Sequence, residues 1–94
     1  MDLRRANLSG AALKKANLSN ADLTEANLSV ADLTGAKLDS AKIRQANLEG
    51  TLLVSADLWH ANLGSANLMF ADLSKAAFIQ GQPNQRLHFR GKIL

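Results

Sequence analysis

A repeat of five residues constrains the fold of this chain more than any other feature. Leucine occupies every fifth position from Leu3 to Leu73, Ile43 is the one substitution, and Phe78 closes the series. Alanine lies two places before this residue in fourteen of sixteen units, and asparagine or aspartate lies between the two in eleven. The sixteen units cover residues 1–80 without an insertion.

Neither a helix nor a flat strand explains this period. Five residues advance about 500° around a helix, so successive leucines would form no apolar stripe. In a strand, an odd spacing would place alternate leucines on opposite faces. The chain must therefore turn once per unit, with Ala and Leu inward, the residue between them outward, and the last two residues at the corner. Corner residues that tolerate positive φ fit this interpretation: Gly10, Asn20, Gly35 and Gly50.

The units "ANLSN ADLTE ANLSV ADLTG", residues 16–35, resemble the pentapeptide-repeat family, whose pattern is A-(D/N)-L-X-X. The resemblance implies an all-β fold: a right-handed quadrilateral parallel β-helix in which four units form the sides of one coil. Residues 1–80 would then give four coils of twenty residues. Residues 81–94 leave the pattern, and we expect this non-repeat C-terminal tail to cap the last coil. The family is abundant in cyanobacteria, so the resemblance suggests a cyanobacterial-type protein.

The order of polar residues fits a coil of twenty residues, in which positions twenty apart lie in one column. Charges of opposite sign align at Arg5 and Glu25, at Asp22 and Lys42, and at Lys37 and Asp57, whereas only Asp2 and Asp22 are alike among neighbouring coils. Four asparagines share another column, and we expect side-chain to side-chain hydrogen bonds along it: Asn7, Asn27, Asn47 and Asn67.

The composition indicates a cytoplasmic protein that does not enter a membrane. The chain has no cysteine, hence no disulfide and no thiolate metal site. No apolar run approaches the ~18 residues that cross a membrane, and the start has no signal-peptide core. Residues 1–80 hold eight basic and eight acidic residues, so the net charge of +3 comes from Arg86, Arg90 and Lys92. We expect no nucleic-acid partner.

The sequence contains no combination of residues that indicates catalysis. A leucine-filled axis leaves no pocket, and neither His60 nor His88 has neighbours at metal-ligand spacing. We therefore expect no catalytic, cofactor or metal site, and a non-enzymatic structural or protein-interaction module of unknown biological role. The resemblance offers one alternative, a DNA mimic that modulates gyrase, because some family members present an acidic, duplex-like rod. The neutral rod and basic tail disfavour it.

Large apolar residues at outward places in the last two coils and in the tail form a candidate interaction surface: Leu52, Val54, Trp59, Met69, Phe70, Ile79, Leu87 and Phe89. Trp59 and Ile79 share a column, and we expect it to be covered by Leu87 and Phe89 of the tail or by a second subunit; if nothing covers Trp59, the patch is a candidate surface for an outside partner. A second hypothesis is a homodimer in which two open first coils stack end to end. The sequence names no partner and no pathway, and it leaves open whether the chain is a module of a larger protein.

Overall fold

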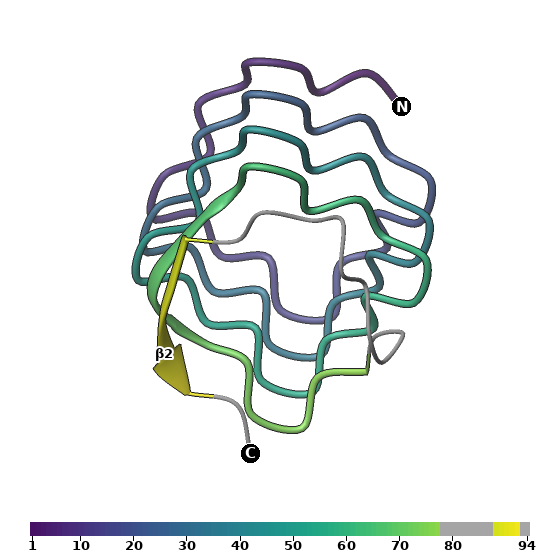
Figure 1. Ribbon diagram of the computed structural model, residues 1–94. Helices are drawn as coiled ribbons and strands as arrows, with labels where there is room; N and C mark the ends of the chain where they lie inside the picture. The colour runs from purple at the N-terminus through teal and green to yellow at the C-terminus, as the bar shows by residue number, and fades with distance from the viewer. Residues whose placement is uncertain (78–87, 93–94) are drawn as a thin grey trace.

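The computed structural model describes residues 1–77 and 88–92. Residues 1–77 wind into a right-handed, four-sided parallel β-helix, seen nearly along its axis in Figure 1. Twelve parallel β-bridges join residues that are twenty apart, from Asp2↔Asp22 to Asp57↔Ala77. The predicted fold class, the coil of twenty residues and the predicted columns are therefore confirmed.

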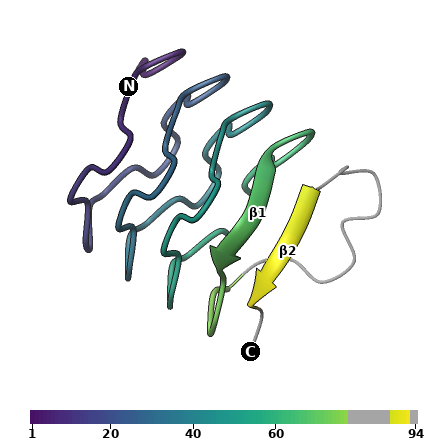
Figure 2. The ribbon, with the colours of Figure 1, turned by 90° about the vertical axis from the view of Figure 1, so that its left-hand side faces the viewer.

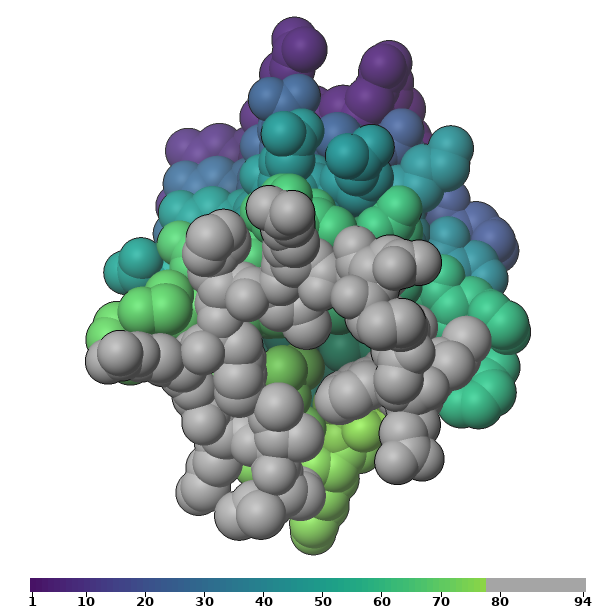
Figure 3. Space-filling model, viewed as in Figure 1, coloured from purple at the N-terminus to yellow at the C-terminus, as the bar shows by residue number. Residues whose placement is uncertain are grey.

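Each five-residue unit forms one side of a coil, and the four sides are named here by their residues. Side 1 comprises 1–5, 21–25, 41–45 and 61–65, and side 2 comprises 6–10, 26–30, 46–50 and 66–70. Side 3 comprises 11–15, 31–35, 51–55 and 71–75, and side 4 comprises 16–20, 36–40, 56–60 and 76–77. Figure 2 shows the coils following one another along the axis. In the space-filling view (Figure 3) their colours form successive bands from purple to green.

The corners are tight turns with a left-handed residue. At the fifth residue of every unit from Arg5 to Lys75, φ is positive, between 49° and 69°. The amide of the next alanine donates to the leucine carbonyl three residues earlier, as in Ala26 N to Leu23 O at 2.9 Å. A bond of this kind with positive φ only at the third turn residue is the pattern of a type II turn. The glycines and asparagine expected at corners are confirmed there.

Backbone hydrogen bonds between coils replace the long strands of an ordinary sheet. In each unit the second residue donates to the preceding coil, as in Asp22 N to Met1 O at 2.9 Å. The leucine and the fifth residue donate to the following coil, as in Leu23 N to Lys42 O at 2.7 Å and Glu25 N to Arg44 O at 2.9 Å. Three of the five amides of a unit thus join one coil to the next, and a fourth closes the turn.

The asparagine or aspartate of the repeat satisfies the remaining amide. Oδ1 of Asn27 accepts hydrogen bonds from the amide and hydroxyl of Ser29, at 3.0 and 2.8 Å. All eleven asparagine and aspartate residues at this place cap the amide two residues later. The expected side-chain ladder along the asparagine column is therefore wrong. The column exists, but each Oδ1 binds its own backbone, because that donor is close in sequence and needs no ordering of a second coil.

Two of these capping carboxylates have pKa values below the ordinary value for aspartate. Hydrogen bonds from the Thr24 hydroxyl and amide lower the pKa of Asp22, and Thr34 lowers the pKa of Asp32 in the same way. A depressed pKa in the folded state contributes stability above the ordinary value of about 3.9, and that stability is lost as the pH falls through the folded pKa. The caps are thus fully charged at neutral pH.

The core is a stack of leucine and alanine with one polar member. Leucines of the second and third coils, such as Leu28 and Leu48, are at most 1% exposed. Thr51, in an alanine place, is fully buried, and its Oγ1 donates to the carbonyl oxygen of Leu28 at 2.7 Å. Because that hydroxyl is satisfied, the polar substitution leaves no unpaired donor in the core.

The first and fourth coils differ in how far their leucines are buried. Leu3, Leu8 and Leu13 of the first coil are only partly buried, whereas Leu68 and Leu73 of the fourth are buried. Strand β1 (Asn67–Asp72) belongs to the fourth coil, and strand β2 (His88–Lys92) pairs with it in parallel (Figure 2). The pairing has an irregularity between Met69 and Asp72, where β1 turns the corner. Strand β2 thus extends the ladder on side 2, and the role of residues 81–94 as a whole stays a prediction.

No helix in residues 1–77 or 88–92 is long and apolar enough to cross a membrane.

Candidate interaction surfaces

The structure divides the predicted interaction surface between two places. Leu52 and Val54 lie on side 3 and Trp59 on side 4, all in the third coil, whereas Met69 and Phe70 end side 2 of the fourth coil. Predictions for Ile79 and Leu87 lie outside the described residues, and Phe89 is placed by its backbone alone, opposite Leu68. Leu52 follows the corner at which Phe70 stands one coil later, whereas Trp59 stands at the diagonally opposite corner, where side 4 ends.

The first place is an apolar row of the third coil: Leu52, Val54 and Trp59. Leu52 is 43% exposed and Trp59 is 49% exposed, while Val54 is half-buried. The Trp59 indole meets the His60 ring edge-on, with 5.6 Å between ring centroids. The row runs from Leu52 on side 3 to Trp59 at the far end of side 4, and the outward-facing Asp57 lies between Val54 and Trp59.

Leu52 occupies a place where the fold favours a different residue. It stands between Asp32 and Asp72 in its column, and both of these aspartates cap the amide two residues later. A leucine has no oxygen with which to cap the Val54 amide, and the hydrogen bonds of the described residues include no side-chain cap for it. Leu52 therefore contributes no capping hydrogen bond to the stability of the fold.

Replacing Leu52 by asparagine is expected to stabilise the protein. The new Oδ1 can cap the Val54 amide as in eleven other units, and a net gain of about 0.5–1 kcal/mol is expected for such a hydrogen bond. Urea unfolding of Leu52→Asn measures the gain, and Leu52→Ala, which removes the apolar group without adding a cap, is the matched control. An asparagine variant no more stable than the alanine variant would contradict the capping argument.

The second place is the corner between sides 2 and 3, where sequence reasoning missed Val30. Val30 and Phe70 are 67% and 68% exposed, and both stand at fifth places of side 2 with positive φ. Val30 is the one β-branched residue among the described residues with positive φ, at 49°. A β-branched side chain is strained in this region. The available signal was the valine of "ANLSV" at a corner position.

Replacing Val30 by asparagine is expected to stabilise the protein by about 1 kcal/mol, because asparagine tolerates the left-handed conformation that strains valine. The measurement is the denaturation midpoint at a protein concentration near 1 µM. Val54→Asn is the matched control: Val54 is also a partly exposed valine, but it is not among the residues with positive φ. A gain of the same size at both positions would show that backbone strain is not its cause.

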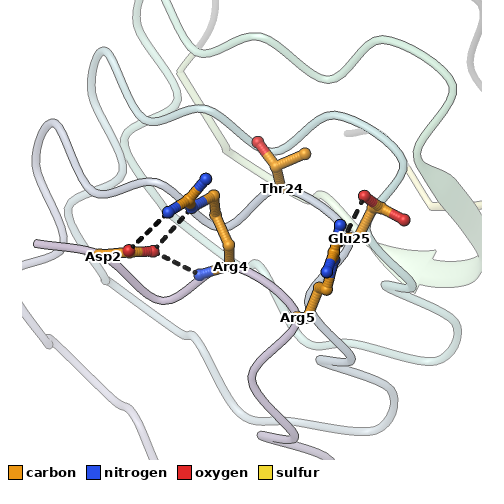
Figure 4. A pocket seen from close by; sticks show the side chains of 5 residues that line it. All are labelled: Asp2, Arg4, Arg5, Thr24 and Glu25. Atoms are coloured by element: carbon orange, nitrogen blue, oxygen red, sulfur yellow. Dashed lines mark hydrogen bonds and ion pairs between the residues drawn. The ribbon is translucent and has the colours of Figure 1, made fainter.

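A shallow polar cavity of about 340 Å³ lies at the first coil, lined by Asp2, Arg4, Arg5, Thr24 and Glu25 (Figure 4). Arg4 donates to both carboxylate oxygens of Asp2, at 3.0 and 2.9 Å, and this contact lowers the pKa of Asp2. Arg5 forms the predicted ion pair with Glu25 at 3.7 Å. Because the arginines already face carboxylates, the cavity offers no uncompensated charge to a ligand.

The described residues contain no cluster with the chemistry of a metal site. In residues 1–77 and 88–92, no group of three histidine, cysteine, aspartate or glutamate side chains is arranged to hold a metal ion. Their acidic and amide side chains are largely engaged as caps of the repeat. The fold and its surface together define a β-helical repeat protein that presents side chains from a rigid scaffold.

Comparison with known families agrees with this class. The model for pentapeptide repeats matches residues 2–39, 31–68 and 46–81, in eight copies. The chain therefore belongs to the pentapeptide-repeat family. A comparison with curated proteins gave no match.

Three solved structures are similar over nearly the whole chain. A pentapeptide-repeat protein of the Arabidopsis thaliana thylakoid lumen has a TM-score of 0.82 and 30% identity, over 97% of this chain and 58% of that one. Rfr23 of the cyanobacterium Cyanothece 51142 has a TM-score of 0.79 and 36% identity, over 98% and 58%. HetL of Nostoc sp. strain PCC 7120, involved in the regulation of heterocyst differentiation, has a TM-score of 0.76 and 44% identity, over 92% and 34%. The chain thus spans about a third to three fifths of their lengths, and one of them is lumenal, so a cytoplasmic location stays a prediction.

Proposed function

We propose that this chain is a non-enzymatic protein-interaction module whose apolar row of the third coil binds a partner protein. The observation that carries the proposal is Leu52, which is 43% exposed in a place where eleven other units hold a capping asparagine or aspartate. Positions that break a local rule without a gain for the fold are where function is expected.

The chemistry of the row suits a protein contact. Trp59 supplies a large apolar surface with one hydrogen-bond donor, the indole N–H, and tryptophan is enriched among residues that dominate binding energy. Leu52 and Val54 add aliphatic surface on side 3 of the same coil, and Asp57 lies between them and Trp59. The partner that fits is a protein whose apolar groups contact both side 3 and the end of side 4 of the third coil.

The gyrase alternative requires a surface that replaces phosphates. The described coils, residues 1–77, contain eight basic and eight acidic residues, so they have no net negative charge. The interaction proposal needs no acidic rod, and we expect no effect of this protein on gyrase supercoiling. Inhibition at micromolar protein would favour mimicry instead.

Affinity capture from the native host tests the proposal with matched variants. The bait is the full chain as wild type, as Leu52→Asn, as Trp59→Ser, and as the control Lys37→Ala, which alters an exposed residue on side 4 of the second coil. We expect one protein to be retained by the wild type and the control, to be lost with both apolar-row variants, and to bind the purified chain directly. Retention that is equal for all four baits would contradict a role of the row.

A further inference from the structure

Side 2 differs from the other sides in its charge. Of its twenty residues in the coils only Glu49 is charged, whereas side 1 has seven charged residues and side 3 has five; strand β2, which extends side 2, adds Arg90 and Lys92. Side 2 also presents the asparagine column, so its outer surface consists of amides, hydroxyls, glycines and a few large apolar groups. A nearly uncharged side of a charged solenoid can approach another surface at little electrostatic cost.

The outward residues of side 2 alternate in size along the axis. From the first coil to the fourth, the fifth places read Gly10, Val30, Gly50 and Phe70. A Cβ atom added at Gly50 would lie 3.1 Å from Cγ1 of Val30, so the valine side chain already leans over this glycine. At Gly10 nothing lies within 4 Å of such an atom. The corner is thus open at Gly10 and partly covered by Val30 at Gly50, while Val30 and Phe70 project from it.

The fourth places of side 2 do not alternate but change from small to large residues along the axis. They read Ser9, Ser29, Glu49 and Met69 from the first coil to the fourth. Stacking is fixed by the ladder, since Val30 N donates to Glu49 O at 2.8 Å and Gly50 N donates to Met69 O at 2.9 Å. The two outward columns therefore lie side by side in register.

We propose that side 2 is the interface of a homodimer, in which two copies pack with their coil axes antiparallel. A two-fold axis perpendicular to the coil axis places Gly10 opposite Phe70 of the partner subunit and Val30 opposite Gly50 of the partner subunit. It also places Ser9 opposite Met69 of the partner subunit and Ser29 opposite Glu49 of the partner subunit. Each contact joins a small residue to a large one, and such a contact is isologous.

The alternative orientations fit less well. With parallel axes the strand direction of side 2 is reversed in the partner subunit, so the fifth places face the opposite edge of the side and the large and small residues of this column do not meet. In the antiparallel arrangement the one charged residue of the side, Glu49, meets a serine hydroxyl that can donate to it. The asparagine column meets itself in reverse, which places amide groups opposite amide groups.

The size of side 2 matches what a stable contact requires. The molecule exposes 5450 Å², which averages roughly 900 Å² for each of six faces, so a contact of standard size would take up nearly the whole of side 2. Standard protein interfaces bury about 800 Å² per partner. Strand β2 extends side 2 beyond the fourth coil, so in the antiparallel arrangement its backbone lies past the first coil of the partner subunit. The contact ends at the corner between sides 2 and 3, two residues before Leu52, and it leaves Trp59 at the end of side 4 accessible.

Exchange of the first and last fifth-place residues tests the arrangement by sedimentation of the full chain between 1 µM and 1 mM. We expect a wild-type dimer. Gly10→Phe should weaken it because two phenylalanines would meet, and Phe70→Gly because two glycines would leave a gap, each by about tenfold or more. The double variant Gly10→Phe, Phe70→Gly restores a small residue opposite each large one, and its dissociation constant should return to within about threefold of the wild type.

Three results would overturn the proposal: a wild-type monomer at 1 mM, single variants that dimerise as well as the wild type, or a double variant as monomeric as the single variants. Circular dichroism confirms that each variant keeps its β signal. Should Gly10→Phe fail to fold, Phe70→Asp tests the same contact at an exposed corner, because a charge there would face the partner, and unchanged dimerisation would overturn the proposal equally. Leu8→Ser, at the open end of the first coil, distinguishes this contact from end-to-end stacking, because only the latter would be lost.

Discussion

Replacing Leu28 by alanine is expected to destabilise the protein by about 2–5 kcal/mol, the range measured for buried leucines elsewhere. Leu28 has no exposed surface, and its column places it between Leu8 and Leu48. A coil cannot collapse onto the resulting cavity without breaking its backbone bonds to the coils on both sides. Denaturant unfolding, with the midpoint and slope compared with those of the wild type, measures the loss.

The control for Leu28→Ala is Lys37→Ala, an exposed residue of the same coil, which should change stability by less than about 0.5 kcal/mol. Equal losses for the two variants would show that leucine is not the residue that holds the stack together.

The opposite change at a corner of the core is expected to cost nearly as much. Ala46 is 1% exposed and lies in a column with Ala26 and Ala66, where the side chain is enclosed in the core just after the turn. Leucine at this place would add three carbons to a filled space, and overpacking of this kind costs about 1–3 kcal/mol or more. Thermal unfolding followed by circular dichroism is a suitable measurement for Ala46→Leu.

Two further variants test whether the position of a residue within its unit, rather than the composition of the unit, determines stability. The double variant Ala46→Leu, Leu48→Ala keeps the residues of the unit but exchanges their places, and it should be no more stable than either single variant. Ala12→Leu puts a leucine at the exposed outward place that Leu52 fills two coils later, and it should have little effect. Full rescue by the exchange would contradict a core with distinct alanine and leucine places.

Much of the fold could be predicted because the five-residue period determines where the chain turns and which residues face inward. A spacing of five excludes a helix stripe and a flat strand, so the inward place of residues such as Leu28 followed from the sequence alone. The four-sided coil came from the family resemblance, since the period by itself shows only that the chain turns once per unit. The ladder then fixes each residue's column, which is why the Arg5–Glu25 ion pair could be predicted.

Details were missed where a side chain could bind either the backbone of its own turn or a residue of the next coil. The asparagine column was expected to bond along the stack, but Asn27 reaches the Ser29 amide within its own turn, at 3.0 Å. Residue preferences indicated glycine and asparagine corners but not Val30, because the coil imposes its corner conformation on whichever residue stands there. Sequence identified the outward apolar residues, whereas only the columns separated Trp59 from Phe70 and revealed the alternation on side 2.

The central claim is that the outward apolar residues serve contacts with other molecules and cost the folded chain stability. Urea unfolding of the double variant Val30→Asn, Leu52→Asn tests it most directly, at about 1 µM protein so that self-association does not contribute. Val30 lies beside Gly50, two residues before Leu52, so the separate gains should add at least in part, to about 1–2 kcal/mol with an unchanged slope. A double variant less stable than the wild type would show that Val30 and Leu52 support the fold, and would contradict the account.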